Sequence, residues 1–213
     1  MNQANSRIPA LILASASPRR QELLDGIELE FRVRPANLDE TALPGETPEA
    51  HVRRLAREKS RLQAGSGELV LAADTVVAID GQILGKPADD LEARSMLRRL
   101  QSRIHTVWTG VALTDGCRRR TVETVERSEV DIGPMSEEDI DWYVATGEPL
   151  DKAGSYAIQG LGALFVTAVR GNYTNVVGLP LPATRALFRQ LGFDLRHFSR
   201  RSGSSRRPGL PRR

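Results

Sequence analysis

Side chains able to bind a chain of phosphates gather near the N-terminus. Residues 10–14 form a short apolar run that is typical of a buried strand. Two serines and two arginines follow it, namely Ser15, Ser17, Arg19 and Arg20. Ser17 is a favourable N-cap residue, and Pro18 suits the first position of a helix. Because a helix N-terminus attracts anions, the segment predicts a polyphosphate cradle. The alternative is an ordinary strand–helix connection whose arginines face water.

Lysine is the rare cation of this chain. Of the 30 basic residues, only three are lysine: Lys59, Lys86 and Lys152. Lysine offers a compact, flexible ammonium group that the planar guanidinium of arginine does not replace. We therefore expect all three lysines to lie in one site. The alternative is that they are scattered over the surface by chance.

Two carboxylates are candidates for metal binding and proton transfer. Residues 69–73 read as a second buried strand, which we expect to end at Asp74 and Thr75, and Glu40 lies in a polar loop. Carboxylates beside a phosphate cradle commonly hold Mg²⁺ or Mn²⁺. A buried carboxylate at a strand end can also act as a general base toward water. The alternative for Asp74 is a turn residue that bonds the nearby backbone.

Three apolar segments end in polar residues, and this shared design predicts one site. The segments are residues 13–17, 71–75 and 158–160. Ligands of α/β folds gather at the ends of strands, so we expect the three polar ends to meet. The chain lacks the GxxxxGK[ST] pattern and a GxGxxG pattern after a strand, which excludes two common nucleotide-binding motifs.

The composition is that of a globular protein. The chain has 213 residues, 40% of them hydrophobic and 27% charged, and its longest apolar runs are far too short to span a membrane. Cys117 is the single cysteine, so no disulfide forms within the chain. The N-terminal residues lack the apolar core of a secretory signal. We expect a cytoplasmic enzyme without a structural metal, and no membrane partner.

The positive charge is concentrated at the C-terminus. Residues 196–213 hold seven of the 30 basic residues and no acid, and removing those seven leaves 23 basic against 27 acidic residues. We expect residues 1–9 to be a disordered N-terminus, residues 10–195 to be the folded domain, and residues 196–213 to be a disordered Arg-rich tail. An inert extension is favoured over specific nucleic-acid binding, although loose contact with nucleic acid stays open.

The remaining pattern predicts a mixed α/β fold. Helical spacing covers residues 48–63, and residues 136–145 begin with a capping-box signature. Long strand-like runs at 105–113 and 121–132 flank an Asp-Gly turn and predict an antiparallel hairpin. Helices combined with long hairpins indicate one α/β unit built around a mixed, twisted sheet that helices flank.

Seven ordered blocks resemble the Maf family of nucleoside triphosphate pyrophosphatases. The resemblance covers about residues 10–192, and its blocks are LASASPRRQELL at 13–24, LDE at 38–40, LAREKS at 55–60, AADTVV at 72–77, GKP at 85–87, TGEPLDKAGSYAIQG at 146–160 and NVVGLPL at 175–181. The resemblance implies a fold like that of the inosine triphosphate pyrophosphatases, with two lobes around a cleft. It also implies hydrolysis between the α- and β-phosphates with a divalent metal.

The resemblance also implies roles for individual residues. Asp74 falls on the position of the proton acceptor, and Glu40, together with Asp74, on the metal-associated positions. The phosphate-handling positions are Ser15, Ser17, Arg20, Lys59, Lys86 and Lys152. The late block is similar to the branch that acts on dTTP and UTP, in which Arg19, Thr75 and Gln159 occupy the selectivity positions. An amide side chain suits this assignment, because it matches the N3–H donor and C4 carbonyl of uracil and thymine.

Other functions stay open at this point. The main alternative is a nucleotide-binding regulator of cell division or septum formation in which hydrolysis is incidental. A related pyrophosphatase with another base preference, such as CTP, is a further alternative. The family resemblance also suggests a possible homodimer.

Overall fold

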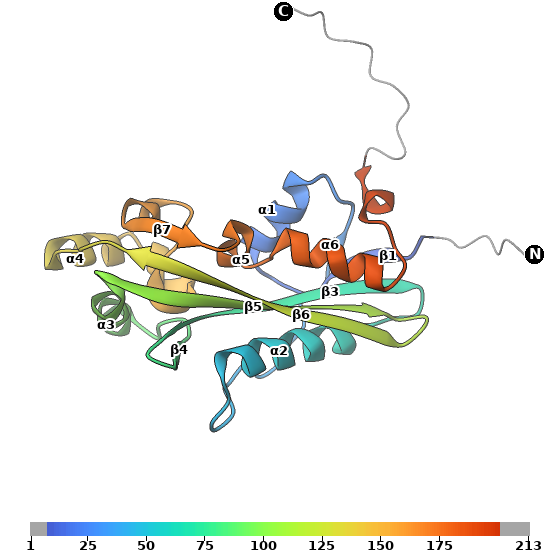
Figure 1. Ribbon diagram of the computed structural model, residues 1–213, viewed down its shortest axis with the longest axis horizontal. Coiled ribbons are helices and arrows are strands. Elements are labelled where there is room, and N and C mark those ends of the chain that lie inside the picture. The colour runs from blue at the N-terminus through green and yellow to red at the C-terminus, as the bar shows by residue number, and fades with distance from the viewer. Residues whose placement is uncertain (1–7, 201–213) are drawn as a thin grey trace, which may run out of the picture.

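The computed structural model describes residues 8–200, which fold around one mixed sheet of seven strands (Figure 1). The strands are β1 (Ala10–Leu13), β2 (Arg32–Val33), β3 (Glu68–Ile79), β4 (Gln82–Leu84), β5 (Arg103–Asp115), β6 (Arg120–Ile132) and β7 (Val166–Arg170). Their order is β2-β1-β3-β5-β6-β7, and β4 pairs with β3 outside this path. β1 is parallel to β2 and to β3, whereas the other pairings are antiparallel. The predicted mixed α/β fold and the long β5–β6 hairpin are confirmed.

Helices cover both faces of the sheet (Figure 1). They are α1 (Pro18–Gly26), α2 (Pro48–Leu62), α3 (Asp90–Leu100), α4 (Glu137–Ala145), α5 (Tyr173–Val177) and α6 (Leu181–Gln190), with short 3-10 turns at Glu148–Asp151, Ala153–Ser155, Leu161–Leu164 and Leu195–Phe198. α2 packs on β3 and β5 from one face, and α6 packs on β5 and β6 from the other (Figure 1). The capping box of α4 joins Ser136 and Asp139, as predicted.

Of the three apolar clusters among the described residues, the two larger ones lie toward opposite ends of the long strands. One core joins β1 and the first half of β3 to α1 and α6, through residues such as Leu71 and Phe188. The other joins the second half of β3 to α3 and α4, through residues such as Val77 and Tyr143. Burial of these two clusters stabilises two lobes that share the strands β3 and β5.

The expectation that a strand ends at Asp74 is wrong. β3 continues without interruption from Glu68 to Ile79, so Asp74 lies within the strand. β5 pairs with β3 along almost its whole length and stabilises the extended backbone past Asp74. Residues 158–160 are also not a strand end, because this segment is irregular and follows a 3-10 turn. Of the three expected strand ends, only the one after β1 is a strand end.

The folded domain runs past the expected boundary at residue 195. Phe198 is buried and contacts Phe188 edge to face, and Arg200 forms an ion pair with Asp25 at 2.6 Å. The rest of the predicted tail, and residues 1–7 of the predicted disordered N-terminus, lie outside the described residues. Within residues 8–200, no helix has the length and apolar character needed to cross a membrane.

Candidate functional site

A cleft of about 660 Å³ lies between the two lobes and contains every predicted site residue. The eleven predicted residues, all among those that line it, are Ser15, Ser17, Arg19, Arg20, Glu40, Lys59, Asp74, Thr75, Lys86, Lys152 and Gln159. The three lysines, which were expected to share one site, all line this cleft. They come from three separate segments: Lys59 from α2, Lys86 from the loop after β4, and Lys152 from the turn before residues 153–155.

The cleft follows a gap along one edge of β3. β1 pairs with β3 only as far as Leu71, and β4 pairs only from Val77 onward. Between these points, no strand in the described part of the chain covers that edge. Asp74 and Thr75 lie in this gap, and they point to opposite faces of the strand because side chains alternate. Both nevertheless line the cleft, since it wraps around the uncovered edge.

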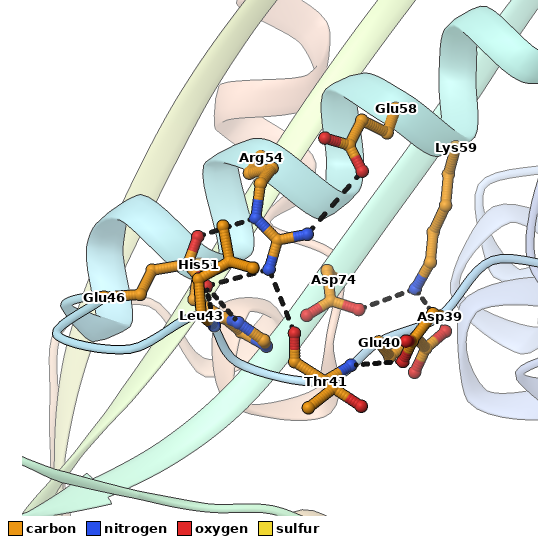
Figure 2. A network of polar contacts seen from close by, with 10 residues as sticks. All are labelled: Asp39, Glu40, Thr41, Leu43, Glu46, His51, Arg54, Glu58, Lys59 and Asp74. Atoms are coloured by element: carbon orange, nitrogen blue, oxygen red, sulfur yellow. Dashed lines mark hydrogen bonds and ion pairs between the residues drawn. The ribbon is translucent and has the colours of Figure 1, made fainter.

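Lys59 joins the two candidate carboxylates (Figure 2). Its Nζ lies 2.7 Å from Asp74 Oδ1 and 2.6 Å from Glu40 Oε1. Lys59 and Asp74 are buried, at 5% and 6% exposure, whereas the Glu40 side chain is 54% exposed. Among the described residues, nothing donates a hydrogen bond to Asp74 Oδ2. That oxygen is therefore available to a ligand in the cleft.

Gly110 of β5 allows α2 to approach the sheet at this place. It pairs with Asp74 across the strands, and a Cβ atom there would lie 2.1 Å from the backbone oxygen of Val52. Any larger residue would push α2 away from the sheet. Lys59 is two helical turns beyond Val52 on α2. The close contact at Gly110 therefore helps to keep the Lys59 ammonium within hydrogen-bond distance of Asp74.

The charges around Glu40 favour its ionised form. Burial opposes ionisation, but the hydrogen bond from Lys59 and the charges of Lys59, Lys86 and Arg20 outweigh it and lower the pKa of Glu40. Two carboxylates within reach of one cation can also bind a hard metal ion through oxygen. The described residues contain no cluster of three or more His, Cys, Asp or Glu side chains suited to a metal. Other ligands of such an ion would therefore be water or phosphate oxygens.

Three residues that no sequence motif singled out, Glu46, His51 and Arg54, anchor the Glu40 loop, which is residues 34–47 between β2 and α2. Glu46 accepts hydrogen bonds from Arg54 Nε at 2.7 Å and from the backbone N–H of Leu43 at 3.0 Å, and His51 Nδ1 lies 3.0 Å from it (Figure 2). Arg54 also donates to the carbonyl of Thr41, the residue next to Glu40. His51 and Arg54 are three residues apart on α2, which places them on one helix face. That spacing was a usable signal, but Glu46 lies outside the helix pattern.

The Glu46 carboxylate is expected to stabilise the fold more at neutral than at acidic pH. The hydrogen bond from Arg54 is the main cause that lowers the pKa of Glu46 from 4.5 to about 2. Its contribution is therefore complete above pH 4.5 and is lost as the pH falls toward 2. Replacing it by Gln is expected to cost about 2 kcal/mol of unfolding free energy at pH 7, because Arg54 loses its buried partner. Urea unfolding of both proteins at pH 7 and at pH 3.5 measures this difference, which should shrink at the lower pH.

Glu58→Gln is the matched control for that measurement. Glu58 contacts the same Arg54, at 3.6 Å, but its side chain is 41% exposed. Exposed ion pairs contribute little, so this change is expected to alter stability by less than about 0.5 kcal/mol. Equal losses in the Glu46 and Glu58 variants would contradict the anchoring role of Glu46.

Arg20 ties three walls of the cleft together. Its guanidinium donates to Gly178 O at 2.8 Å, to Ser15 Oγ at 2.9 Å and to Thr75 Oγ1 at 3.0 Å. These partners come from the loop after β1, from β3 and from the end of α5. Burial lowers the pKa of Arg20, against the opposing charges of Asp74 and Glu40. Arg20 thus positions Ser15 and Thr75 as well as placing positive charge at the cleft.

The start of α1 opens onto the cleft, with one difference from expectation. Pro18 begins the helix and Ser17 occupies the N-cap position, as predicted, but the Ser17 side chain makes no capping hydrogen bond. The backbone N–H of Ser17 instead donates to Ser15 Oγ at 3.2 Å, which fixes the turn without the Ser17 hydroxyl. That hydroxyl stays available to a ligand, next to Arg19 and the helix N-terminus.

The opposite wall carries Lys152 and Gln159. Lys152 Nζ donates to Glu148 O at 3.0 Å and forms an ion pair with Asp151. Gln159 is exposed, and its amide group makes no hydrogen bond within the described residues. Tyr156 also lines this wall, and its hydroxyl is 2.8 Å from Nε2 of buried His105. Burial lowers the pKa of His105 to about 4, so this imidazole is neutral at pH 7 and supports Tyr156.

Comparison with known protein families identifies one family whose model matches nearly the whole chain. The family described as Maf-like protein matches residues 10–191, which include every residue of the cleft discussed above. The chain belongs to the Maf-like protein family. The seven sequence blocks that resembled this family therefore identified it correctly, and the mixed seven-stranded sheet is the fold that the resemblance implied.

Three curated relatives of this Maf-like chain share one functional name. A dTTP/UTP pyrophosphatase of Anaeromyxobacter dehalogenans (strain 2CP-C) is 54% identical over 189 residues, covering 88% of this chain and 96% of the relative. One of Myxococcus xanthus (strain DK1622) is 50% identical and covers 87% and 94%. One of Salinibacter ruber (strain DSM 13855 / M31) is 52% identical and covers 85% and 89%. The similarity thus extends over nearly the whole length of these relatives.

Proposed function

We propose that this Maf-like protein hydrolyses dTTP and UTP to the nucleoside monophosphate and pyrophosphate. The observation that carries the proposal is the grouping of Asp74, Glu40 and Lys59 with the N-terminus of α1 in one cleft. A water-activating carboxylate beside a phosphate cradle suits phosphoanhydride hydrolysis. Near-full-length relatives named dTTP/UTP pyrophosphatase support the same substrates.

In the proposed mechanism, cationic groups hold the triphosphate and Asp74 handles the proton. The phosphates lie against the N-terminus of α1, with Arg20, Lys86 and Lys152 neutralising their charge. Asp74 Oδ2 accepts a proton from a water molecule whose oxygen attacks the α-phosphorus. The bond from the α-phosphorus to the bridging oxygen breaks, and pyrophosphate leaves with the electron pair. Lys59 holds Asp74 Oδ1 during this step and so orients the carboxylate.

A divalent cation fits the same place. Glu40 and Asp74 offer the hard oxygen donors that Mg²⁺ and Mn²⁺ prefer, and they would hold the ion together with phosphate oxygens. Such an ion supplies charge neutralisation for the phosphates and a point of orientation for them. Base selection is assigned to Arg19, Thr75 and Gln159, of which Gln159 has a free amide able to match uracil or thymine.

Pyrophosphate release from a panel of nucleoside triphosphates tests the proposal. The panel contains dTTP, UTP, CTP, GTP and 7-methyl-GTP, each with Mg²⁺ or Mn²⁺. We expect turnover of dTTP and UTP at least about tenfold faster than that of 7-methyl-GTP, because a site built for one hydrogen-bonding pattern rejects analogues that lack it. Tight binding of every triphosphate without turnover would instead support a regulatory nucleotide-binding protein. A homodimer stays a prediction, which light scattering of the purified protein checks.

A further inference from the structure

Two polar side chains outside the cleft, buried Tyr143 and half-buried Glu148, contact the segment that carries Gln159. Tyr143 of α4 is fully buried, and Glu148 opens the 3-10 turn that follows α4. The Tyr143 hydroxyl donates to Glu148 Oε1 at 2.8 Å. Burial is the main cause that raises the pKa of Tyr143, so its hydroxyl keeps its proton at neutral pH. Neither side chain lines the cleft, and the mechanism above uses neither.

This pair binds the backbone on both sides of Gln159. After Gln159, the Glu148 carboxylate accepts the N–H of Leu161 at 3.0 Å and that of Gly162 at 2.9 Å. Before Gln159, the Tyr143 hydroxyl accepts the N–H of Ala157 at 3.0 Å. One carboxylate–phenol pair therefore holds both ends of the segment 157–162, and Gln159 lies between the two attachment points.

The backbone of residues 160–162 lies in close contact with the Glu148 carboxylate. Gly160, next to Gln159, has a φ of +89° and a ψ of −149°, a region that is essentially restricted to glycine. A Cβ atom on Gly160 would lie 2.4 Å from Glu148 Oε2. The bonds to the backbone of Gly162 and Leu161 and to Tyr143, with the charge of Lys152, lower the pKa of Glu148 despite its burial. Its carboxylate is thus a charged, triply bonded anchor at pH 7.

We infer that Glu148, with Tyr143, is a positioning residue for base selection, which acts by holding Gln159 in place. The inference rests on the proposed function, because it concerns how the same site reads its pyrimidine base. The Gln159 side chain itself has no partner among the described residues, so only its backbone can be held before substrate binds. Fixing that backbone lowers the entropy lost when the amide bonds the base.

The test is a double-mutant cycle on UTP hydrolysis with Glu148→Ala and Gln159→Ala. Each single change is expected to lower kcat/KM for UTP roughly tenfold, mostly by raising KM. A loss of that size corresponds to one hydrogen bond to the base. In the Gln159→Ala background, Glu148→Ala is expected to cause less than about a threefold further loss, because its effect passes through Gln159. Two losses that multiply would show a general structural role and overturn the inference.

Two further variants guard against loss of folding. Tyr143→Phe keeps the buried ring and removes only the bridging hydroxyl. We therefore expect KM for UTP to rise in this variant too, but by less than in Glu148→Ala. Glu137→Ala is the control, because Glu137 also belongs to α4 and its carboxylate, among the described residues, pairs only with exposed Arg98. The control is expected to keep wild-type kcat and KM. An unchanged KM in both the Glu148→Ala and Tyr143→Phe variants would overturn the inference.

The outcomes separate this inference from the proposed function. A wild-type protein that releases no pyrophosphate from UTP or dTTP overturns both. Normal wild-type turnover with a Gln159→Ala variant that resembles wild type keeps the hydrolase but overturns the positioning role, since Glu148 then has no base reader to act through. Amide hydrogen exchange gives an independent readout, because Glu148→Ala is expected to increase exchange at 157–162 and not in β5 or β6.

Discussion

Replacing Asp74 by Asn is expected to lower kcat for dTTP and UTP by about 10²–10⁴, the usual contribution of a general base. Asn retains the shape of the side chain and an oxygen that can accept the bond from Lys59, but its amide group cannot take a proton from water. Asp74 lies within β3 and its backbone is paired with Gly110 of β5, so the strand does not depend on the charge. The loss is therefore expected in catalysis and not in folding.

Steady-state pyrophosphate release and a thermal unfolding curve measure the two effects separately. Asp80→Asn is the matched control, because Asp80 follows the same strand but forms an exposed pair with Arg103 outside the cleft. The control is expected to keep wild-type turnover. If the Asp74 variant also turned over dTTP at nearly the wild-type rate, Asp74 could not be the group that accepts the proton.

Replacing Lys59 by Met is expected to affect both activity and stability strongly. The change removes the ammonium shared by Asp74 and Glu40, and it leaves Asp74 buried without its ion-pair partner. We expect a decrease of about 2–4 kcal/mol in unfolding free energy, in the range found when one partner of a buried pair is removed. We also expect kcat/KM for UTP to fall by roughly 10², because the carboxylates lose the cation that orients them.

The same variant tests the proposed metal position without measuring activity. A divalent ion held by Glu40 and Asp74 would neutralise the charges that Lys59 no longer pairs. Mn²⁺ is therefore expected to raise the thermal midpoint of Lys59→Met by more than that of wild type, since a ligand stabilises the state that binds it. Arg61→Met on the exposed side of α2 is the control, and it should respond like wild type. An equal Mn²⁺ response in all three proteins would place the ion elsewhere.

Residue types, local patterns and the family resemblance together named eleven residues that line one cleft. The rarity of lysine singled out Lys59, Lys86 and Lys152, and all three line the cleft. The start of α1 was also readable, because proline and apolar periodicity are local signals. Several of the predicted residues are polar or charged side chains that directly follow apolar runs of the sequence, such as residues 10–14 and 69–73.

The pairing of these residues depended on contacts that no local pattern contains. Asp74 looked like the end of a strand, yet β3 runs on because β5 pairs with it, while the early end of β1 uncovers its other edge. The Glu148 carboxylate reaches the backbone of Leu161 and Gly162 across a turn whose shape depends on the packing of Tyr143.

By itself, the sequence determined the fold class through periodicity, and it determined the family and the predicted residues that line the cleft through residue chemistry and the resemblance of seven ordered blocks. Only the tertiary structure decided that Lys59 joins Asp74 to Glu40 and that Glu46 anchors the Glu40 loop. Lys59 and Asp74 lie 15 residues apart, on a helix and on a strand, and they meet because α2 packs against the sheet at Gly110. The contacts of Arg54 with Glu46 and Thr41 join α2 to the loop before it over 8 and 13 residues, so the periodicity of neither segment contains them.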